Sequence, residues 1–306
     1  MSEFEQGAPE DDTKRVDVQP TDVESQFPVL TFVENGPLYS DLAGLDESIR
    51  MLEQVGTIFL NPEMADEYDV QMPSGVLLHG PAGVGKTQLV KAFANDIKAQ
   101  LINVSVSDIL GGHVGEPNIR LKKLFTSAQT RKDPVVLFFD EIDGLFSKNA
   151  GGNTGVNTSL VAEFKTLMST LRREQQNTIV VGCTNKIDVF DESLIRPGRF
   201  DVVIPITLPD VECRQRIFSS YISRRIDLYK IGAGETLVRE GGIIDLNELA
   251  KGTEGMTGAD IESILHTART SRLVARLQRN EAVTRVTQND IQNAIKQHRL
   301  SRSSGN

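Results

Sequence analysis

The feature that most constrains this chain is a glycine-rich segment, GPAGVGKT, at residues 80–87. It follows the apolar run Val76, Leu77 and Leu78 and precedes a helical pattern that begins at Gln88. A buried strand, a tight turn and a helix in this order aim backbone N–H groups and the positive end of a helix dipole at one small volume. Such a volume suits phosphate, so the segment predicts a nucleotide site rather than a plain glycine-rich turn.

The side chains of this loop have separable roles. Lys86 supplies a mobile positive charge for β- and γ-phosphate oxygens, and the hydroxyl of Thr87 suits Mg²⁺. Because the other positions offer backbone N–H groups, the predicted nucleotide-binding set comprises Pro81, Ala82, Gly83, Val84, Gly85, Lys86, Thr87 and Gln88.

Composition bounds the class of protein. At 306 residues the chain can form one large domain or two of ordinary size, and 39% hydrophobic with 25% charged residues is typical of a soluble globular protein. No apolar run has membrane-spanning length, and the first residues are acidic where a signal peptide would be basic. A net charge of −9 disfavours a broad nucleic-acid-binding face. Cys183 and Cys213 are far apart and indicate free thiols in a reducing compartment, so we expect a cytoplasmic protein.

Apolar runs alternate with helical patterns along most of the chain, which is typical of a parallel sheet covered by helices on both faces. The patterns predict helices at residues 46–60, 88–99, 119–130 and 159–173, and strands at residues 76–78, 101–104, 135–139, 178–183 and 202–206. Beyond Pro209 they predict helices only, at residues 211–226 and 247–251 and after capping boxes at Thr257 with Asp260 and at Thr287 with Asp290. The glycine-rich segment 232–242 has no assigned role.

These patterns divide the chain into four parts. Residues 1–27 are polar and acidic and are predicted to form a disordered arm, because they cannot bury enough apolar surface to offset the entropy of ordering. Residues 28–209 form the α/β nucleotide-binding domain, residues 210–300 a small α-helical domain, and residues 301–306 a disordered tail.

Two acids end the apolar run at residues 135–139. An acid at the tip of a strand beside a phosphate loop can hold Mg²⁺ through water, and a second acid can orient or deprotonate the attacking water. Asp140 suits the first role and Glu141 the second. The alternative is that both acids merely begin the next helix, where negative charge is favoured. Beside a phosphate loop, the pair predicts hydrolysis as well as binding.

Further segments, taken in order, resemble the AAA ATPase family over about residues 39–299. Residues 39–45 (YSDLAGL) are similar to its adenine-pocket segment, 184–188 (TNKID) to its sensor segment, 194–201 (LIRPGRFD) to its arginine-finger signature and 256–260 (MTGAD) to its lid contact. The resemblance implies a P-loop NTPase fold with a helical lid, ATP and Mg²⁺ as cofactors, and a ring, usually hexameric, that remodels or unfolds protein substrates. The substrate and any adaptor are not specified.

The resemblance also implies catalytic roles. Asn185 would hydrogen-bond both the attacking water and the γ-phosphate, although a turn asparagine is the ordinary alternative. Arg196 and Arg199 would reach the γ-phosphate held by the neighbouring subunit, where the transition state needs cations. Structural salt bridges are the alternative for the two arginines.

Two groups of residues would contact the rest of the nucleotide in such a protein. Asp41, Ala43 and Gly44 match the segment at the adenine end. Gly258 and Ala259 match the lid contact, where other ATPases of the wider superfamily place an arginine.

The resemblance is strained at residues 110–116 (LGGHVGE). Family members often carry a basic residue, an aromatic, an aliphatic and glycine here, on a loop that faces the central pore, whereas this chain has Gly112, His113 and Val114. The ring of His113 could still grip a substrate peptide, or it could be a plain turn residue. The glycine-rich stretch 150–155 could be a second pore loop or a flexible connection.

Two other functions stay open from the sequence. A DNA-linked loader would need a basic channel face, which the acidic balance disfavours. A nucleotide-gated assembly switch, whose output is binding rather than threading, is favoured by the unusual pore segment.

Overall fold

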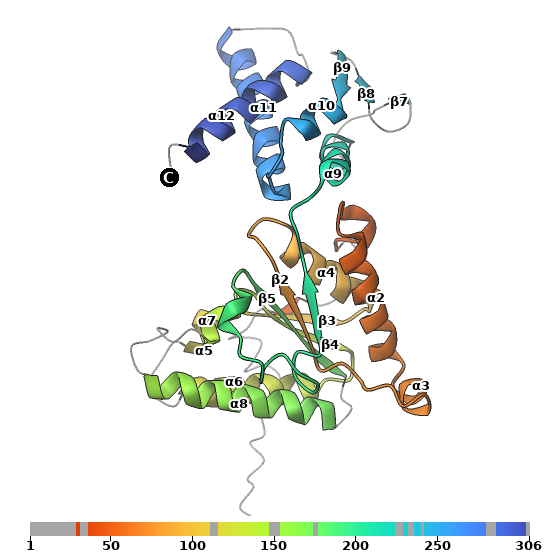
Figure 1. Ribbon diagram of the computed structural model, residues 1–306, viewed down its shortest axis with the longest axis vertical. Helices are drawn as coiled ribbons and strands as arrows, with labels where there is room; N and C mark the ends of the chain where they lie inside the picture. Colours follow the sequence, from red (N-terminus) through yellow and green to blue (C-terminus); the bar gives the residue numbers. More distant parts are fainter. Residues whose placement is uncertain are drawn as a thin grey trace, which may run out of the picture.

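The computed structural model describes residues 29–30, 36–110, 116–146, 154–173, 177–223, 229–231, 236–239, 242–279 and 286–303. They form an α/β unit and a smaller, mainly helical unit, which the chain enters directly after the last strand of the central sheet (Figure 1).

The central sheet has the strand order β1-β3-β4-β5-β2-β6. Its strands are β1 (Val29–Leu30), β2 (Gly75–His79), β3 (Gln100–Val104), β4 (Val135–Phe139), β5 (Thr178–Thr184) and β6 (Val202–Pro205). β1 is antiparallel to β3 and the other neighbours are parallel. Because β2 pairs with β5 up to the register of His79 with Thr184, the segments that follow these strands emerge side by side.

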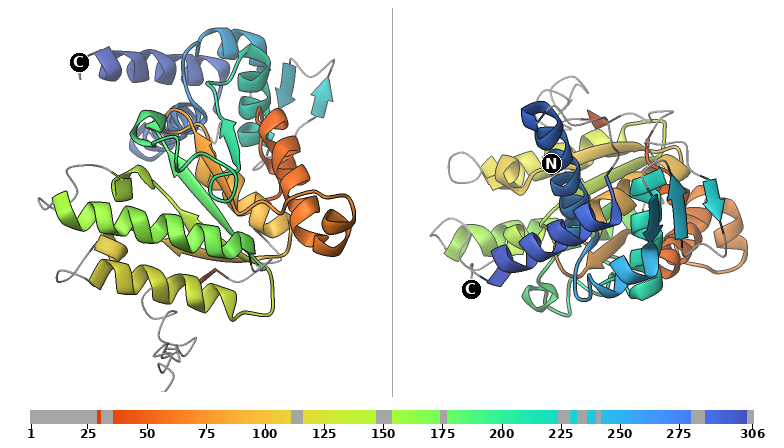
Figure 2. Two further views of the ribbon diagram at one scale, coloured as in Figure 1. Left: turned by 60° about the horizontal axis from the view of Figure 1, so that its bottom comes forward. Right: turned by 90° about the horizontal axis from the view of Figure 1, so that it is seen from above.

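Helices cover both faces because strand side chains alternate between them. In β4, Val135, Leu137 and Phe139 join one buried cluster, while Val136 and Phe138 join the other. The first face is covered by α5 (Val106–Leu110), α6 (Glu116–Gln129), α7 (Asp143–Phe146) and α8 (Thr154–Arg173), the second by α2 (Asp46–Leu60) and α4 (Lys86–Asp96). Figure 2 shows α6 and α8 on one side of the sheet and α2 on the other. The predicted α/β fold is confirmed.

The helical unit contains α9 (Val211–Ser223), α10 (Leu246–Lys251), α11 (Gly258–Arg279) and α12 (Gln288–Ser303), packed around a core of their own. Both predicted capping boxes are present. The N–H of Thr257 donates to Asp260 Oδ2 (2.8 Å) and the N–H of Asp260 to Thr257 Oγ1 (3.2 Å). Thr287 and Asp290 make the same pair of bonds, at 2.7 and 3.3 Å.

The expectation of helices only beyond Pro209 is wrong. Strands β7 (Tyr229–Ile231), β8 (Thr236–Arg239) and β9 (Gly242–Asp245) form an antiparallel sheet between α9 and α10. Strands of three or four residues are too short to show a clear alternation of apolar and polar residues, and the glycines of this region favoured a loop, so the strands were not predicted. α9 is described as far as Ser223, and the last three residues of the predicted helix, 224–226, lie outside the described residues.

Several boundaries also differ from the prediction. α4 begins at Lys86 rather than Gln88, which places Lys86 and Thr87 in its first turn. α6 and α8 begin earlier than predicted, and α12 continues to Ser303, into the segment predicted as a disordered tail. The short elements β1, α3 (Pro62–Glu67), α5 and α7 were not predicted. The arm at residues 1–27 lies outside the described residues.

Among the described helices, none is both long and apolar enough to cross a membrane.

Candidate nucleotide-binding site

A cavity of about 760 Å³ lies where the loops after β2, β4 and β5 face α9 and α11 of the helical unit. Most of the predicted site residues line it: Asp41, Ala43, Ala82, Gly83, Val84, Gly85, Lys86, Thr87, Gln88, Asp140, Glu141, Asn185, Gly258 and Ala259. The predicted residues Gly44, Pro81, Arg196 and Arg199 are not part of this lining. Segments far apart in the sequence thus converge on one volume.

Lys86 is held by three oxygen acceptors. Its Nζ donates to the carbonyls of Gly80 and Pro81, both at 2.8 Å, and to Asn185 Oδ1 at 2.7 Å, and the residue is only 8% exposed. Burial lowers the pKa of Lys86 from its usual value, and the nearby Asp140 carboxylate partly opposes that change. The predicted phosphate-binding cation therefore touches the predicted sensor residue directly, across the loops that follow β2 and β5.

Thr87 and Asp140, the predicted magnesium ligands, are also paired. Thr87 Oγ1 donates to Asp140 Oδ2 at 3.0 Å. The described residues contain no group of three metal-ligating side chains. A hydroxyl with one carboxylate nonetheless fits Mg²⁺, which usually keeps several waters and takes one or two protein oxygens beside substrate phosphates.

Glu141 has an unusual backbone conformation. Its φ is 51°, in the left-handed region that a residue with a Cβ occupies at a cost of about 1–2 kcal/mol. Its N–H donates to Asp140 Oδ1 at 3.1 Å, and the exposed side chain belongs to the cavity lining. The sharp turn after β4 therefore places both acids at the cavity.

Thr184 fixes the turn that carries Asn185. Its hydroxyl, on a residue only 1% exposed, donates to Asp143 Oδ1 at 2.8 Å and accepts from the N–H of Lys186 at 2.9 Å. The sequence placed Thr184 in the sensor segment but gave it no role.

The helical unit contacts the phosphate loop directly. The N–H of Ala259, in the first turn of α11, donates to the carbonyl of Gly83 at 3.1 Å. Gly83 has φ 79°, and a Cβ on it would lie 2.9 Å from Thr257 Oγ1 and 3.0 Å from the Cβ of Ala259. Only glycine allows this close approach without displacing α11.

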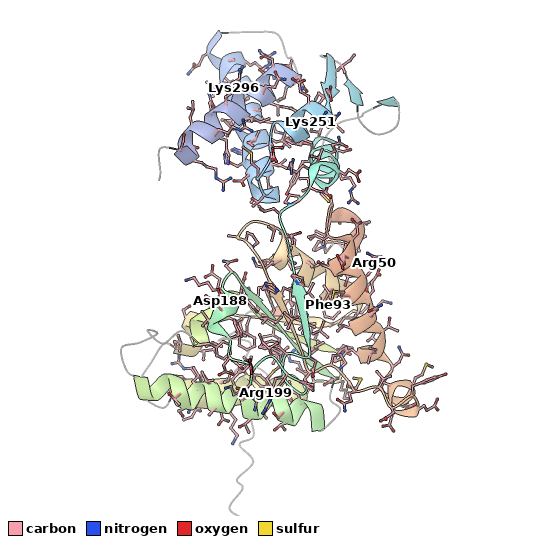
Figure 3. All side chains as sticks on the ribbon, viewed as in Figure 1. Arg50, Phe93, Asp188, Arg199, Lys251 and Lys296 are labelled. Atoms are coloured by element: carbon pink, nitrogen blue, oxygen red, sulfur yellow. The ribbon has the colours of Figure 1, made fainter. Side chains whose placement is uncertain are left out.

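Arg199 lies at the opposite end of β2 from the phosphate loop. A Cβ on Gly75, the first residue of β2, would lie 2.6 Å from the Arg199 carbonyl, and five residues of strand span about 16 Å. Figure 3 shows Arg199 at the end of the α/β unit remote from the helical unit. One of its guanidinium nitrogens donates to the Ser193 carbonyl, while Arg196 is exposed. The structure therefore does not bring either arginine to the cavity of its own chain.

Sequence reasoning missed ten residues of the lining: Gly36, Pro37, Leu42, Leu45, Cys183, Thr184, Ile217, Ser220, Tyr221 and Glu262. Glu262 follows Gly258 by one helical turn, so helical spacing could have indicated it. Ile217 and Tyr221 are likewise one turn apart on α9. No signal in the sequence points to Gly36 or Pro37. Cys183 and Cys213 are both free thiols.

The predicted pore residues Gly112, His113 and Val114 lie outside the described residues. The same holds for residues 150–153 of the second glycine-rich stretch, whose last two residues belong to α8.

Relatives of this chain include proteins of archaea. It is 35% identical over 268 residues to the proteasome-activating nucleotidase of Saccharolobus solfataricus, an alignment that covers 87% of this chain and 63% of that protein. It is 34% identical over 229 residues to proteasome-activating nucleotidase 2 of Halobacterium salinarum, covering 74% and 52% of the two chains. The chain therefore spans between about half and two thirds of the length of these relatives.

Two family models match consecutive parts of the chain. The model described as "ATPase family associated with various cellular activities (AAA)" matches residues 76–208, which hold the parallel strands and the loops that line the cavity. The model described as "AAA+ lid domain" matches residues 243–293, which hold α10 and α11 and the beginning of α12. The resemblance noted from the sequence is thereby confirmed, and the chain belongs to the AAA family of ATPases.

Proposed function

We propose that this chain is a Mg²⁺-dependent ATPase that assembles with copies of itself into a ring, a homo-hexamer, and uses ATP hydrolysis to remodel or unfold proteins. The observation that carries the proposal is the convergence of Lys86, Thr87, Asp140, Glu141 and Asn185 on one cavity that the lid also lines. The names of the relatives, proteasome-activating nucleotidases, favour protein substrates.

The side chains divide the work of hydrolysis. Lys86 would exchange its carbonyl acceptors and Asn185 for phosphate oxygens, because a charged ligand offers the stronger hydrogen bonds. Glu141 would accept a proton from the water that attacks the γ-phosphorus, while Asn185 orients that water and the bond to the departing ADP oxygen breaks. Mg²⁺, held by Thr87 and Asp140, would draw negative charge from the phosphate oxygens.

A neighbouring chain would complete the site. Arg196 and Arg199 are remote from the cavity of their own chain, so they can stabilise transition-state charge only in another. The cavity face of one chain then contacts the arginine face of its neighbour. Such a heterologous contact, repeated from chain to chain, generates a ring when the rotation between neighbours closes on itself.

The lid would couple ATP hydrolysis to movement of the substrate. Because Ala259 binds the phosphate loop at Gly83, loss of the γ-phosphate can shift α11 against the α/β unit. We propose that this shift moves a substrate-gripping loop at Gly112, His113 and Val114. An adaptor or the arm at residues 1–27 would recruit the substrate, and the free cysteines suit the cytoplasm.

The test replaces the proposed base. Glu141→Gln should bind ATP as the wild type does but hydrolyse it about a hundredfold or more slowly, since a positioned general base contributes at least that factor. Calorimetric binding and phosphate release measure the two properties. Glu63→Gln, a matched change at an exposed acid of α3, should leave both unaltered. Wild-type turnover in Glu141→Gln would remove the assigned base.

A further inference from the structure

Among the lid side chains in the cavity wall that have no role in the hydrolysis described above, two are hydrogen-bonded to each other. Tyr221 is on α9 and Glu262 on α11, and the phenol of Tyr221 donates to Glu262 Oε2 at 3.1 Å. The backbone carbonyl of Tyr221 accepts in turn from Arg269 Nη2 at 2.9 Å. The hydrogen bond that the phenol donates links the carboxylate on α11 to α9.

Glu262 differs from the other acids of the wall in its surroundings. Asp140 accepts from Thr87, Glu141 follows Asp140 at the end of β4, and Asp41 accepts from the N–H of Leu38 at 2.9 Å. Glu262 is held by the lid alone among the contacts described. A carboxylate repels a triphosphate, so its presence in the wall is favourable only where the ligand offers it a hydrogen-bond donor.

A nucleotide has two kinds of donor, the hydroxyls of its ribose and the exocyclic amino group of its base. The bond from Ala259 to Gly83 fixes the start of α11 on the phosphate loop. Glu262 lies three residues further along, which is about 4.5 Å of helix. The position next to the phosphates is that of the sugar, whereas the base would lie toward Gly36, Pro37 and Leu42.

We propose that Glu262, oriented by Tyr221, accepts a hydrogen bond from a ribose hydroxyl and so makes the site select ribonucleotides over deoxyribonucleotides. This inference rests on the proposed nucleotide site. Because the phenol occupies Oε2, the other carboxylate oxygen is left to accept from the sugar. A site built to hydrogen-bond a hydroxyl discriminates against the analogue that lacks it, since the acceptor then loses that bond.

Calorimetric titration with diphosphates tests the proposal without hydrolysis. The full chain is titrated with ADP, 2′-deoxy-ADP, 3′-deoxy-ADP and inosine diphosphate, which lacks the amino group. The wild type should bind ADP about tenfold more tightly than at least one deoxy analogue, the effect of one hydrogen bond at a partly exposed charged acceptor. Glu262→Ala should bind ADP more weakly than the wild type does, so that its affinities for ADP and for that deoxy analogue differ by no more than about twofold.

Two further variants separate the role of the pair from a general effect on the lid. Tyr221→Phe keeps the ring but removes the donor, and should leave an intermediate preference. Glu254→Ala removes an exposed lid acid outside the cavity and should behave as the wild type. Thermal melting and circular dichroism establish that each variant is folded, which is expected because Glu262 is exposed.

The contrary results are distinct. A wild type that binds ADP and both deoxy analogues equally, or a Glu262→Ala variant that keeps the preference, would overturn the proposal. If Glu262→Ala erased the preference for ADP over inosine diphosphate instead, the acid would recognise the base and not the sugar. A wild type that bound none of the four nucleotides would refute the nucleotide site itself.

Discussion

The side chain of Lys86 is held in place by hydrogen bonds within the chain. The residue is only 8% exposed, and the Gly80, Pro81 and Asn185 oxygens accept hydrogen bonds from its ammonium group in place of water. Those acceptors hold the side chain beside Thr87 and Asp140, which are themselves hydrogen-bonded. Phosphate binding therefore exchanges one set of acceptors for another and does not have to order a free side chain.

Asp260 carries the clearest pH dependence at this scale. Burial opposes its charge, but hydrogen bonds from Thr257 and His298 outweigh burial and hold the pKa of Asp260 below its usual value. His298 Nε2 lies 2.9 Å from Oδ1, and Arg302 adds an ion pair at 3.2 Å, so one carboxylate joins α11 to α12.

We therefore expect Asp260→Asn to lower the free energy of unfolding by about 1–3 kcal/mol at pH 7. A carboxyl whose pKa is lower in the folded chain contributes fully above its unfolded value of about 3.9 and ceases to contribute as pH falls through the folded value. The difference between wild type and variant should narrow below about pH 4. Urea unfolding followed by circular dichroism measures the free energy of unfolding of both proteins at each pH. A difference between them that stays constant from pH 7 to pH 3 would show that the ionised Asp260 carboxylate does not stabilise the lid.

At the scale of elements, the seam between the α/β unit and the lid depends on shape more than on charge. Arg216 of α9 pairs with Asp46 of α2 at 3.1 and 2.8 Å, but both side chains are about half exposed, so the pair contributes at most about 1 kcal/mol. Gly44, in contrast, has φ 83°, and a Cβ on it would lie 2.8 Å from the Cβ of Cys213.

Gly44→Ala should therefore push α9 away from the segment that carries Ala43 and Leu45 in the cavity wall. We expect weaker ADP binding and a lower melting temperature. Gly255→Ala is the matched control, since Gly255 has φ 73° but open space around its Cβ, so it should cost only the backbone strain of about 1–2 kcal/mol. If Gly44→Ala and Gly255→Ala had the same ADP affinity and the same melting temperature, the close contact between Gly44 and Cys213 would not contribute to ADP binding or to stability.

The sequence predicts long, buried elements well and short ones poorly. β4 consists of five buried residues and α2 has a clear apolar face, and both were predicted at their observed bounds. β7, β8 and β9 were missed because three or four residues show no period. In the site, the order of motifs indicated Lys86 and Asp140. Helical spacing can place Tyr221 and Glu262 on the cavity side of α9 and α11, but the hydrogen bond between them could not be predicted, because it depends on how the two helices pack.

At the scale of the whole molecule, one chain does not bring all the proposed catalytic residues together. Its phosphate loop follows the carboxyl end of β2, whereas Arg199 lies against the amino end. A mixing experiment tests whether a neighbour provides the arginine. Arg199→Ala and Lys86→Ala chains should each be inactive alone, yet their equal mixture should regain about a quarter of wild-type turnover per chain if subunits assort randomly around the ring.

The control for mixing is a chain that carries both substitutions. Mixed with Arg199→Ala chains it should give no recovery, since neither partner then has Arg199. Absence of recovery in the first mixture at every ratio would count against catalysis between subunits.

The most direct measurement of the central claim, that hydrolysis requires two chains, is ATP turnover per chain against protein concentration, with mass followed by light scattering. Turnover should rise as single chains assemble at saturating ATP and fall again on dilution. Full turnover by material that remains a single chain would contradict the account.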